Sequence, residues 1–181
     1  MAEDKKPLII STTAQLARVA QELYKRGFKI KPEVVDKGNI RTLLANSLGL
    51  AFANLSLSDE NYYVIDWQTW QEIIRYDWTD KMKYLTDIRD CDNFAFAFSS
   101  RMSEIFGINT ATVAFGDIFW LNSSGQRIKG RHAFNVIITK MEGRLKILIY
   151  EPMNDGSYLI ELGKPYKIGK WEYSPDWVIA F

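Results

Sequence analysis

The segments His132-Ala-Phe-Asn-Val-Ile-Ile-Thr-Lys140 and Leu145-Lys-Ile-Leu-Ile-Tyr150 flank a turn at Glu142-Gly143. The first segment alternates in the way of a half-buried strand, and the short turn is typical of a β-hairpin. Other segments with strand character lie outside the hairpin, at residues 110–121, 158–162 and 177–181, the last expected as an edge strand. The second half of the chain therefore predicts an antiparallel sheet.

The first half of the chain has the spacing of amphipathic helices instead. We expect helices at about residues 12–27, 39–52, 67–76 and 91–107. Asp66 and Asp90 are good N-caps for the last two, and Gly107 is expected to end the fourth. Helices followed by strands predict the α+β class, with the N-terminal helices packed on the sheet.

The chain has 181 residues, a net charge of +1 and 47% hydrophobic residues, which is the composition of an ordinary globular domain. We expect a helical N-terminal region at residues 1–61 and a core at 62–181, together one compact unit. Neither a basic stripe nor a nucleic-acid motif is present, so no nucleic acid is expected. Apolar runs are too short for a signal peptide or a membrane span, which predicts a cytoplasmic protein without a membrane partner. Packaging in a virion, or action in a host cytoplasm if the protein is phage-encoded, stays open, and the sequence indicates no oligomeric state.

The single cysteine and single histidine allow one Cys–His pairing. Cys91 begins a predicted helix, where unpaired N–H groups and the helix dipole favour the thiolate. His132 begins one strand of the hairpin and Glu151 ends the other, so we expect the two to face each other across the ladder. Thiol, imidazole and carboxylate are the parts of a cysteine nucleophile with its base and its orienting group.

Each of these residues has an ordinary alternative role. A lone cysteine is most often a small buried apolar residue, and a lone histidine is usually structural. Glu151 before Pro152 fits a plain strand end. The joint pattern is more specific than its parts, and it predicts nucleophilic catalysis by Cys91.

Three short motifs carry a resemblance to a known family: Asp90-Cys-Asp-Asn-Phe-Ala95, His132-Ala-Phe-Asn135 and Glu151-Pro152. Over about residues 62–162 the chain resembles the papain-like and transglutaminase-like cysteine enzymes. It looks closest to the C-terminal protease domain of the Marasmius-type fungal agglutinins and related bacterial and phage proteins. The resemblance implies that Cys91 is the nucleophile, His132 the general base and Glu151 the orienting acid, with a protein or peptide as substrate.

The resemblance also implies a divalent metal, chiefly calcium, close to these residues. Asp92 matches the acidic position beside the nucleophile, and Asp90 is a second candidate ligand. The family's glutamine after the Glu-Pro pair is absent here, where Met153 and Asn154 stand. Charge from Asp90 and Asp92 should raise the pKa of the thiol, and bound calcium would neutralise it. The alternative is that Asp90 caps the helix and Asp92 favours its first turn; the thiol chemistry itself requires no cofactor.

Three more residues are candidates for the site. Tyr84 is the best polar candidate for an oxyanion donor, with a core ring as its alternative, and Asn135 and Trp120 are expected to line the site. The predicted activity is cleavage of peptide or isopeptide bonds through an acyl-thioester. Two alternatives remain: transfer of the acyl group to an amine on the same residues, and a non-catalytic phage or bacterial binding or structural protein.

Overall fold

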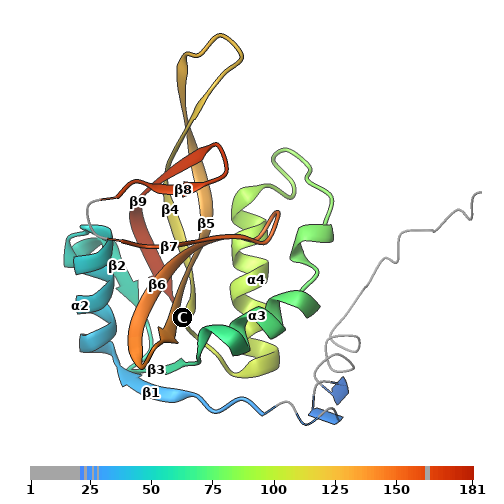
Figure 1. Ribbon diagram of the computed structural model, residues 1–181, viewed down its shortest axis with the longest axis vertical. Helices are drawn as coiled ribbons and strands as arrows, with labels where there is room; N and C mark the ends of the chain where they lie inside the picture. The colour runs from blue at the N-terminus through green and yellow to red at the C-terminus, as the bar shows by residue number, and fades with distance from the viewer. Residues whose placement is uncertain (1–20, 23, 26, 28, 162–163) are drawn as a thin grey trace, which may run out of the picture.

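The computed structural model describes residues 21, 22, 24, 25, 27, 29–161 and 164–181 (Figure 1). The helix predicted over residues 12–27 lies largely outside these residues. In chain order the elements are β1 (Glu33–Asp36), α2 (Lys37–Leu48), η1 (Phe52–Asn54), β2 (Leu55–Leu57), β3 (Asn61–Val64), α3 (Trp67–Tyr76), η2 (Thr79–Lys81), α4 (Cys91–Phe106), β4 (Ala111–Leu121), β5 (Arg127–Met141), β6 (Arg144–Glu151), β7 (Gly156–Leu159), β8 (Tyr166–Ile168) and β9 (Trp171–Ala180). The chain is thus mixed helix and sheet, as predicted.

A seven-stranded sheet forms the centre of the molecule, in the order β2-β9-β4-β5-β6-β7, with β8 paired to β9. Its neighbours are antiparallel except β2 and β9, which run parallel. Strands β1 and β3 form a separate antiparallel ribbon. The predicted hairpin is present as β5 and β6, and β4 and β5 extend together beyond the rest of the sheet (Figure 1).

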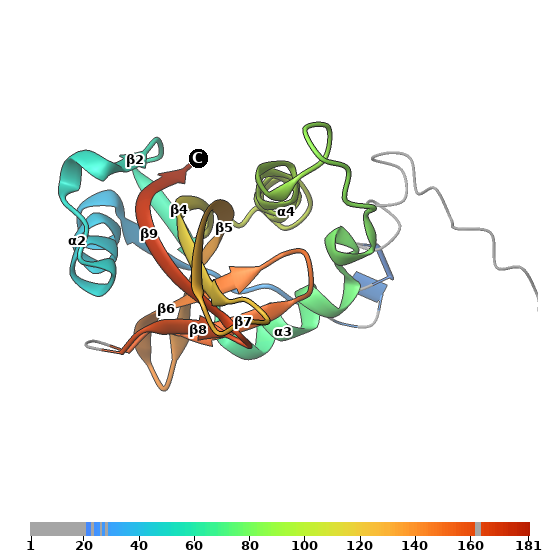
Figure 2. The same ribbon diagram turned by 90° about the horizontal axis from the view of Figure 1, so that it is seen from above.

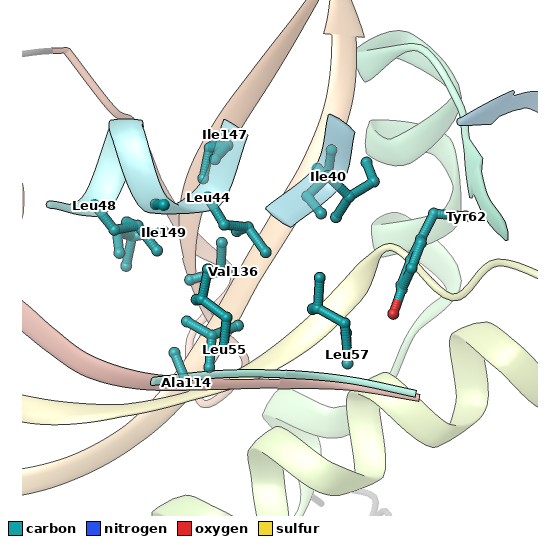
Figure 3. Close-up of a cluster of buried hydrophobic side chains, with 14 of the residues drawn as sticks. Ile40, Leu44, Leu48, Leu55, Leu57, Tyr62, Ala114, Val136, Ile147 and Ile149 are labelled. Atoms are coloured by element: carbon teal, nitrogen blue, oxygen red, sulfur yellow. The ribbon is translucent and has the colours of Figure 1, made fainter. Parts of the chain in front are cut away.

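Helices cover both faces of the sheet, α2 on one side and α3 with α4 on the other (Figure 2). Because side chains alternate along a strand, Phe134, Val136 and Ile138 of β5 point into the core beneath α2, whereas Ile137 packs with Trp70 and other side chains of α3 and α4. Figure 3 shows the α2 side, where leucines and isoleucines of the helix meet leucines of β2, isoleucines of β6 and Val136 of β5.

The helix boundaries follow their caps. Asp66 caps α3 by accepting a hydrogen bond from the Thr69 N–H at 2.9 Å, and α3 spans the residues predicted for it. The fourth predicted helix is α4, which begins at Cys91 and ends before Gly107. Helix α2 ends at Leu48, four residues earlier than expected, because Gly49 takes a left-handed conformation.

The last predicted strand was placed wrongly. Strand β9 is not an edge strand: it lies inside the sheet between β2 and β4, and it begins at Trp171, six residues before the expected start. Pro175 sits where the register between β4 and β9 shifts, next to Gly116. A proline normally argues against an interior strand, and a bulge is the place that tolerates it.

Strand β2 affects the predicted division of the chain. It pairs with β9, so residues 55–57 belong to the same sheet as the predicted core. The separation into regions 1–61 and 62–181 stays a prediction, with the N-terminal side contributing β2 and α2 to the central core. In the part of the chain that the structure describes, no helix is both long and apolar enough to span a bilayer.

Candidate functional site

Cys91, His132 and Glu151 meet where strands β5 and β6 separate. The ladder between these strands ends at the pair Asn135–Tyr150, so His132 lies beyond the part of β5 that pairs with β6. By this register Glu151 is level with Phe134 rather than with His132, which corrects the expected facing pair by two residues. The two side chains still meet diagonally, as cross-strand neighbours on one face can.

The Glu151 carboxylate is held by three groups. Its Oε2 lies 2.6 Å from His132 Nε2 and accepts a hydrogen bond from the Tyr173 hydroxyl at 3.0 Å. Its Oε1 accepts a bond from the Met153 N–H at 3.3 Å. With Glu151 almost fully buried and each oxygen occupied, the carboxylate fixes the orientation of the imidazole and leaves Nδ1 as the second ring nitrogen.

Cys91 is the first residue of α4 and is partly buried. Burial raises the pKa of its thiol, but hydrogen bonds from the His132 side chain and from the Ala133 backbone outweigh burial, and the net shift is downward. The Ala133 N–H can donate a hydrogen bond to the Cys91 sulfur because β6 does not pair with that part of β5. The thiolate is therefore favoured by the imidazole and by a backbone N–H.

The pKa of His132 moves in the opposite direction. Burial lowers it, whereas hydrogen bonds to Cys91 and Glu151 and their negative charges raise the pKa to about 9. A raised imidazole pKa next to a lowered thiol pKa favours the thiolate–imidazolium form of the pair over the neutral form. The described geometry therefore suits a thiol that attacks an electrophilic carbon, with a proton ready on the imidazole.

A hollow of about 340 Å³ opens beside these side chains. Its walls come from α4, from the strands β4, β5 and β9, from the end of β6 and from the loops at residues 84 and 153–154. They consist of Tyr84, Cys91, Ile118, Trp120, Gly130, Arg131, His132, Glu151, Met153, Asn154, Trp171 and Tyr173. Tyr84 and Trp120 line it, and the role of Tyr84 as an oxyanion donor stays a prediction. The ring of Tyr84 stacks on Phe94, and its pKa is raised by burial and by the nearby charge of Cys91.

Asn135 does not line the hollow. Its side chain is fully buried, and its Nδ2 donates to the carbonyl oxygens of Ala95 at 2.9 Å and Thr112 at 3.0 Å. These bonds tie α4 to β4 and thereby hold the helix start near β5. Asn135 is thus a structural link beneath the site.

Asp90 and Asp92 flank the thiol. The Asp90 N–H donates to Asn93 Oδ1 at 3.2 Å, and the Asn93 N–H donates to Asp92 Oδ1 at 2.8 Å, so Asp90 is the N-cap of α4 and Asp92 lies in its first turn. The pKa of Asp90 is raised by its hydrogen bond with Asp92. Among the described residues, no group of three or more His, Cys, Asp or Glu side chains could hold a metal ion. Two carboxylates are few for calcium, which takes six to eight oxygens, and calcium binding stays a prediction.

Sequence reasoning missed Tyr173. It is buried on β9, donates to Glu151 and lies 6.0 Å from the His132 ring centroid. The alternation from Trp171 to Tyr173 is typical of a strand, but Pro175 argued against a strand through these residues because proline is unfavourable inside a sheet.

No known family model and no curated protein matches the chain. Solved structures do match. One is titled as a complex of PSL1a with E64; it is 18% identical with a TM-score of 0.58, and the match covers 81% of this chain and 51% of that one. Another is titled as a lectin of Polyporus squamosus bound to the human-type influenza-binding epitope Neu5Aca2-6Galb1-4GlcNAc. It is 21% identical with a TM-score of 0.52, and the match covers 81% of this chain and 49% of that one.

The likeness is one of fold, and the chain spans about half the length of these neighbours. The comparisons contradict the predicted membership of a papain-like or transglutaminase-like cysteine protease family, because no family match supports it and one of the matching structures is titled a lectin. The predicted hydrolase activity and the predicted protein or peptide substrate are corrected on the same ground, since the bound partner named for the lectin is a glycan.

Proposed function

We propose that this chain is a ligand-binding protein whose ligand occupies the hollow beside Cys91 and meets an activated thiol there. The observation that carries the proposal is the line of hydrogen bonds from Cys91 through His132 to Glu151, at the wall of a hollow of about 340 Å³. A structural cysteine needs neither the imidazole nor the buried carboxylate.

The roles of the three residues follow from their chemistry. Cys91 is the nucleophile, His132 holds the proton that the thiol has given up, and Glu151 fixes the imidazole. The Tyr84 hydroxyl is the candidate donor to an oxygen of the ligand, and Trp120 supplies an apolar wall. A ligand with an electrophilic carbon would be captured covalently in this arrangement.

The titles of the neighbours supply two probes. E64 is an epoxide, and a thiolate opens an epoxide by forming a sulfur–carbon bond while a carbon–oxygen bond breaks. The resulting alkoxide takes its proton from the imidazolium, so atoms and charge balance without a further reactant. The first test is intact-mass spectrometry of the native protein with E64: one adduct on the wild type, none on Cys91→Ser, and slow labelling of His132→Ala. Adduct formation only after unfolding would refute an activated thiol.

A glycan is the second candidate ligand, favoured by two partly buried indoles in the hollow, those of Trp120 and Trp171, beside the polar side chains of Arg131 and Asn154. Tryptophan rings are large apolar surfaces with a polar edge, suited to the face of a sugar ring. The probe is the trisaccharide named for the lectin. Saturable protection of Cys91 from alkylation by this trisaccharide would support sugar binding in the hollow, and an unchanged alkylation rate at millimolar concentrations would exclude it.

A further inference from the structure

One side of the hollow is apolar and aromatic. We call it the aromatic subsite and define it as Ile118, Trp120 and Trp171. Trp120 lies on β4 and Trp171 on β9, with ring centroids 5.0 Å apart and ring planes at 62°. Both indoles are partly buried against the core while they line the hollow, so their position is set by packing.

Gly130 makes room for this subsite. In the register of β4 and β5 it stands opposite Ile118, next to the pair Trp120–Ile128. A Cβ added at Gly130 would lie 3.3 Å and 3.4 Å from two carbons of the Trp120 ring. The indole therefore lies against a strand position without a side chain, and an added side chain there would push on the ring by a few tenths of an ångström or more.

The strand sets the spacing between Gly130, which lies next to Trp120, and His132, which bonds to the thiol. Gly130 and His132 are two residues apart on β5, which is roughly 7 Å along the strand. Both line the hollow with Cys91. A ligand whose electrophilic atom meets the thiol would thus bring a group one short linker away against Trp120 and Trp171.

We propose that the aromatic subsite selects ligands that carry a flat apolar ring one short linker away from the atom that meets Cys91. The inference rests on the first candidate of the proposed function, the electrophilic ligand captured by Cys91, because it assigns the class of that ligand in the same hollow. Two indoles at an angle offer a ring both a face and an edge, the geometries that aromatic pairs prefer. An apolar ring also loses its water on entry, which favours binding.

The test compares iodoacetamide with N-benzyl iodoacetamide. Both react alike, because the Cys91 sulfur–carbon bond forms as the carbon–iodine bond breaks and iodide leaves. The rate ratio of the two reagents is measured on the protein and divided by the ratio on glutathione, which removes intrinsic reactivity. The expected value for the wild type is about ten. Trp171→Ala and Gly130→Ala should bring it close to one, the first by removing an indole and the second by displacing one.

Trp177→Ala is the matched control, since Trp177 is a tryptophan of the same strand, 41% exposed and absent from the lining of the hollow. It should keep a ratio of about ten. Circular dichroism shows which variants are folded. Because Trp171→Ala and Gly130→Ala test the subsite independently, the test can still be read if one of them fails to fold. A wild-type ratio of one with fast iodoacetamide labelling overturns the subsite alone. Slow iodoacetamide labelling of the native protein overturns the proposed function.

Discussion

His132 Nε2 and Glu151 Oε2 lie 2.6 Å apart, and the two side chains are only 13% and 5% exposed. A carboxylate in this position stabilises the imidazolium over the neutral ring. Since the chain contains one histidine, the titration of this ring can be followed without ambiguity.

Glu151→Gln should lower the pKa of His132. The wild-type value is raised to about 9, partly by the hydrogen bond and charge of Glu151, and the amide supplies no charge. NMR titration of the single histidine should show the midpoint moving down toward the ordinary value of about 6.5. Tyr173→Phe is the control, because it removes a bond to Glu151 but keeps the carboxylate, and its midpoint should move less. A midpoint that stays near 9 in Glu151→Gln would show that the carboxylate does not set it.

His132→Ala should shift the pH profile of Cys91 alkylation upward. In the wild type the thiol pKa is lowered by His132 and Ala133 against the effect of burial. The reactive thiolate is therefore present at a lower pH than the ordinary pKa of a thiol would allow. Without the imidazole, burial should dominate and move the midpoint of the iodoacetamide rate above that value. Identical profiles for the two proteins would rule out the pairing.

Asp90→Asn should make Cys91 more reactive near neutral pH. The negative charge of Asp90 raises the thiol pKa, and asparagine keeps the N-cap preference of the position. The midpoint of alkylation should fall below that of the wild type. Calcium, if it binds between Asp90 and Asp92, should produce the same shift in the wild type and none in Asp90→Asn. A slower reaction in Asp90→Asn would mean that the acid supports the thiolate in another way.

Gly116→Ala should destabilise the protein strongly. A Cβ at this position would lie 2.2 Å from the Ser174 carbonyl oxygen, across the bulge between β4 and β9. Two backbones cannot separate there without breaking the pairing, and we expect a loss of about 3 kcal/mol in the free energy of unfolding. Gly49→Ala is the control. Gly49 has a φ of +68° and open space around it, so alanine there should lower the free energy of unfolding only through the left-handed conformation, by about 1 kcal/mol. Equal losses in urea denaturation would argue against the close approach.

Arg101→Met should loosen the loop that leads to the site. The guanidinium lies 3.5 Å from Asp77 Oδ1, donates to Thr79 Oγ1 at 2.5 Å and stacks on the Trp78 ring at 3.6 Å. The Asp77 side chain is 2% exposed, so removing Arg101 leaves a buried carboxylate without its cation, although it still accepts a hydrogen bond from the Thr79 N–H at 3.0 Å. The expected loss is about 3 kcal/mol, and hydrogen exchange should rise at residues 77–90. Lys81→Met removes a cation whose side chain is 76% exposed and should cost far less.

The helices next to the site were predictable because their signals are local. Asp66, Asp90 and Gly107 mark ends that depend on side chains within one turn, and the structure places α3 and α4 at those ends. The hairpin of β5 and β6 followed from alternation and a short turn. The Cys91, His132 and Glu151 contact followed from combining these elements.

The remaining parts depend on partners far away in the chain. Strands β2 and β8 have three residues each, too few to show a period, and they exist because β9 pairs with them. Tyr173 became part of the site only through that sheet order. The sequence does not show that Asn135 is buried. A polar residue at one strand position looks the same in sequence whether its side chain lines a hollow or bonds to a buried carbonyl.

The place of β9 between β2 and β4 also bears on synthesis. During translation, β2 is synthesised more than a hundred residues before β9. Strand β4 therefore lacks one of its two neighbouring strands until residues 171–180 have emerged from the ribosome. Until then, two strand edges stay open to other chains, which is the condition that promotes aggregation. The sheet is therefore expected to close after these residues leave the exit tunnel, and a fragment that stops at residue 165 should need a chaperone to remain in solution.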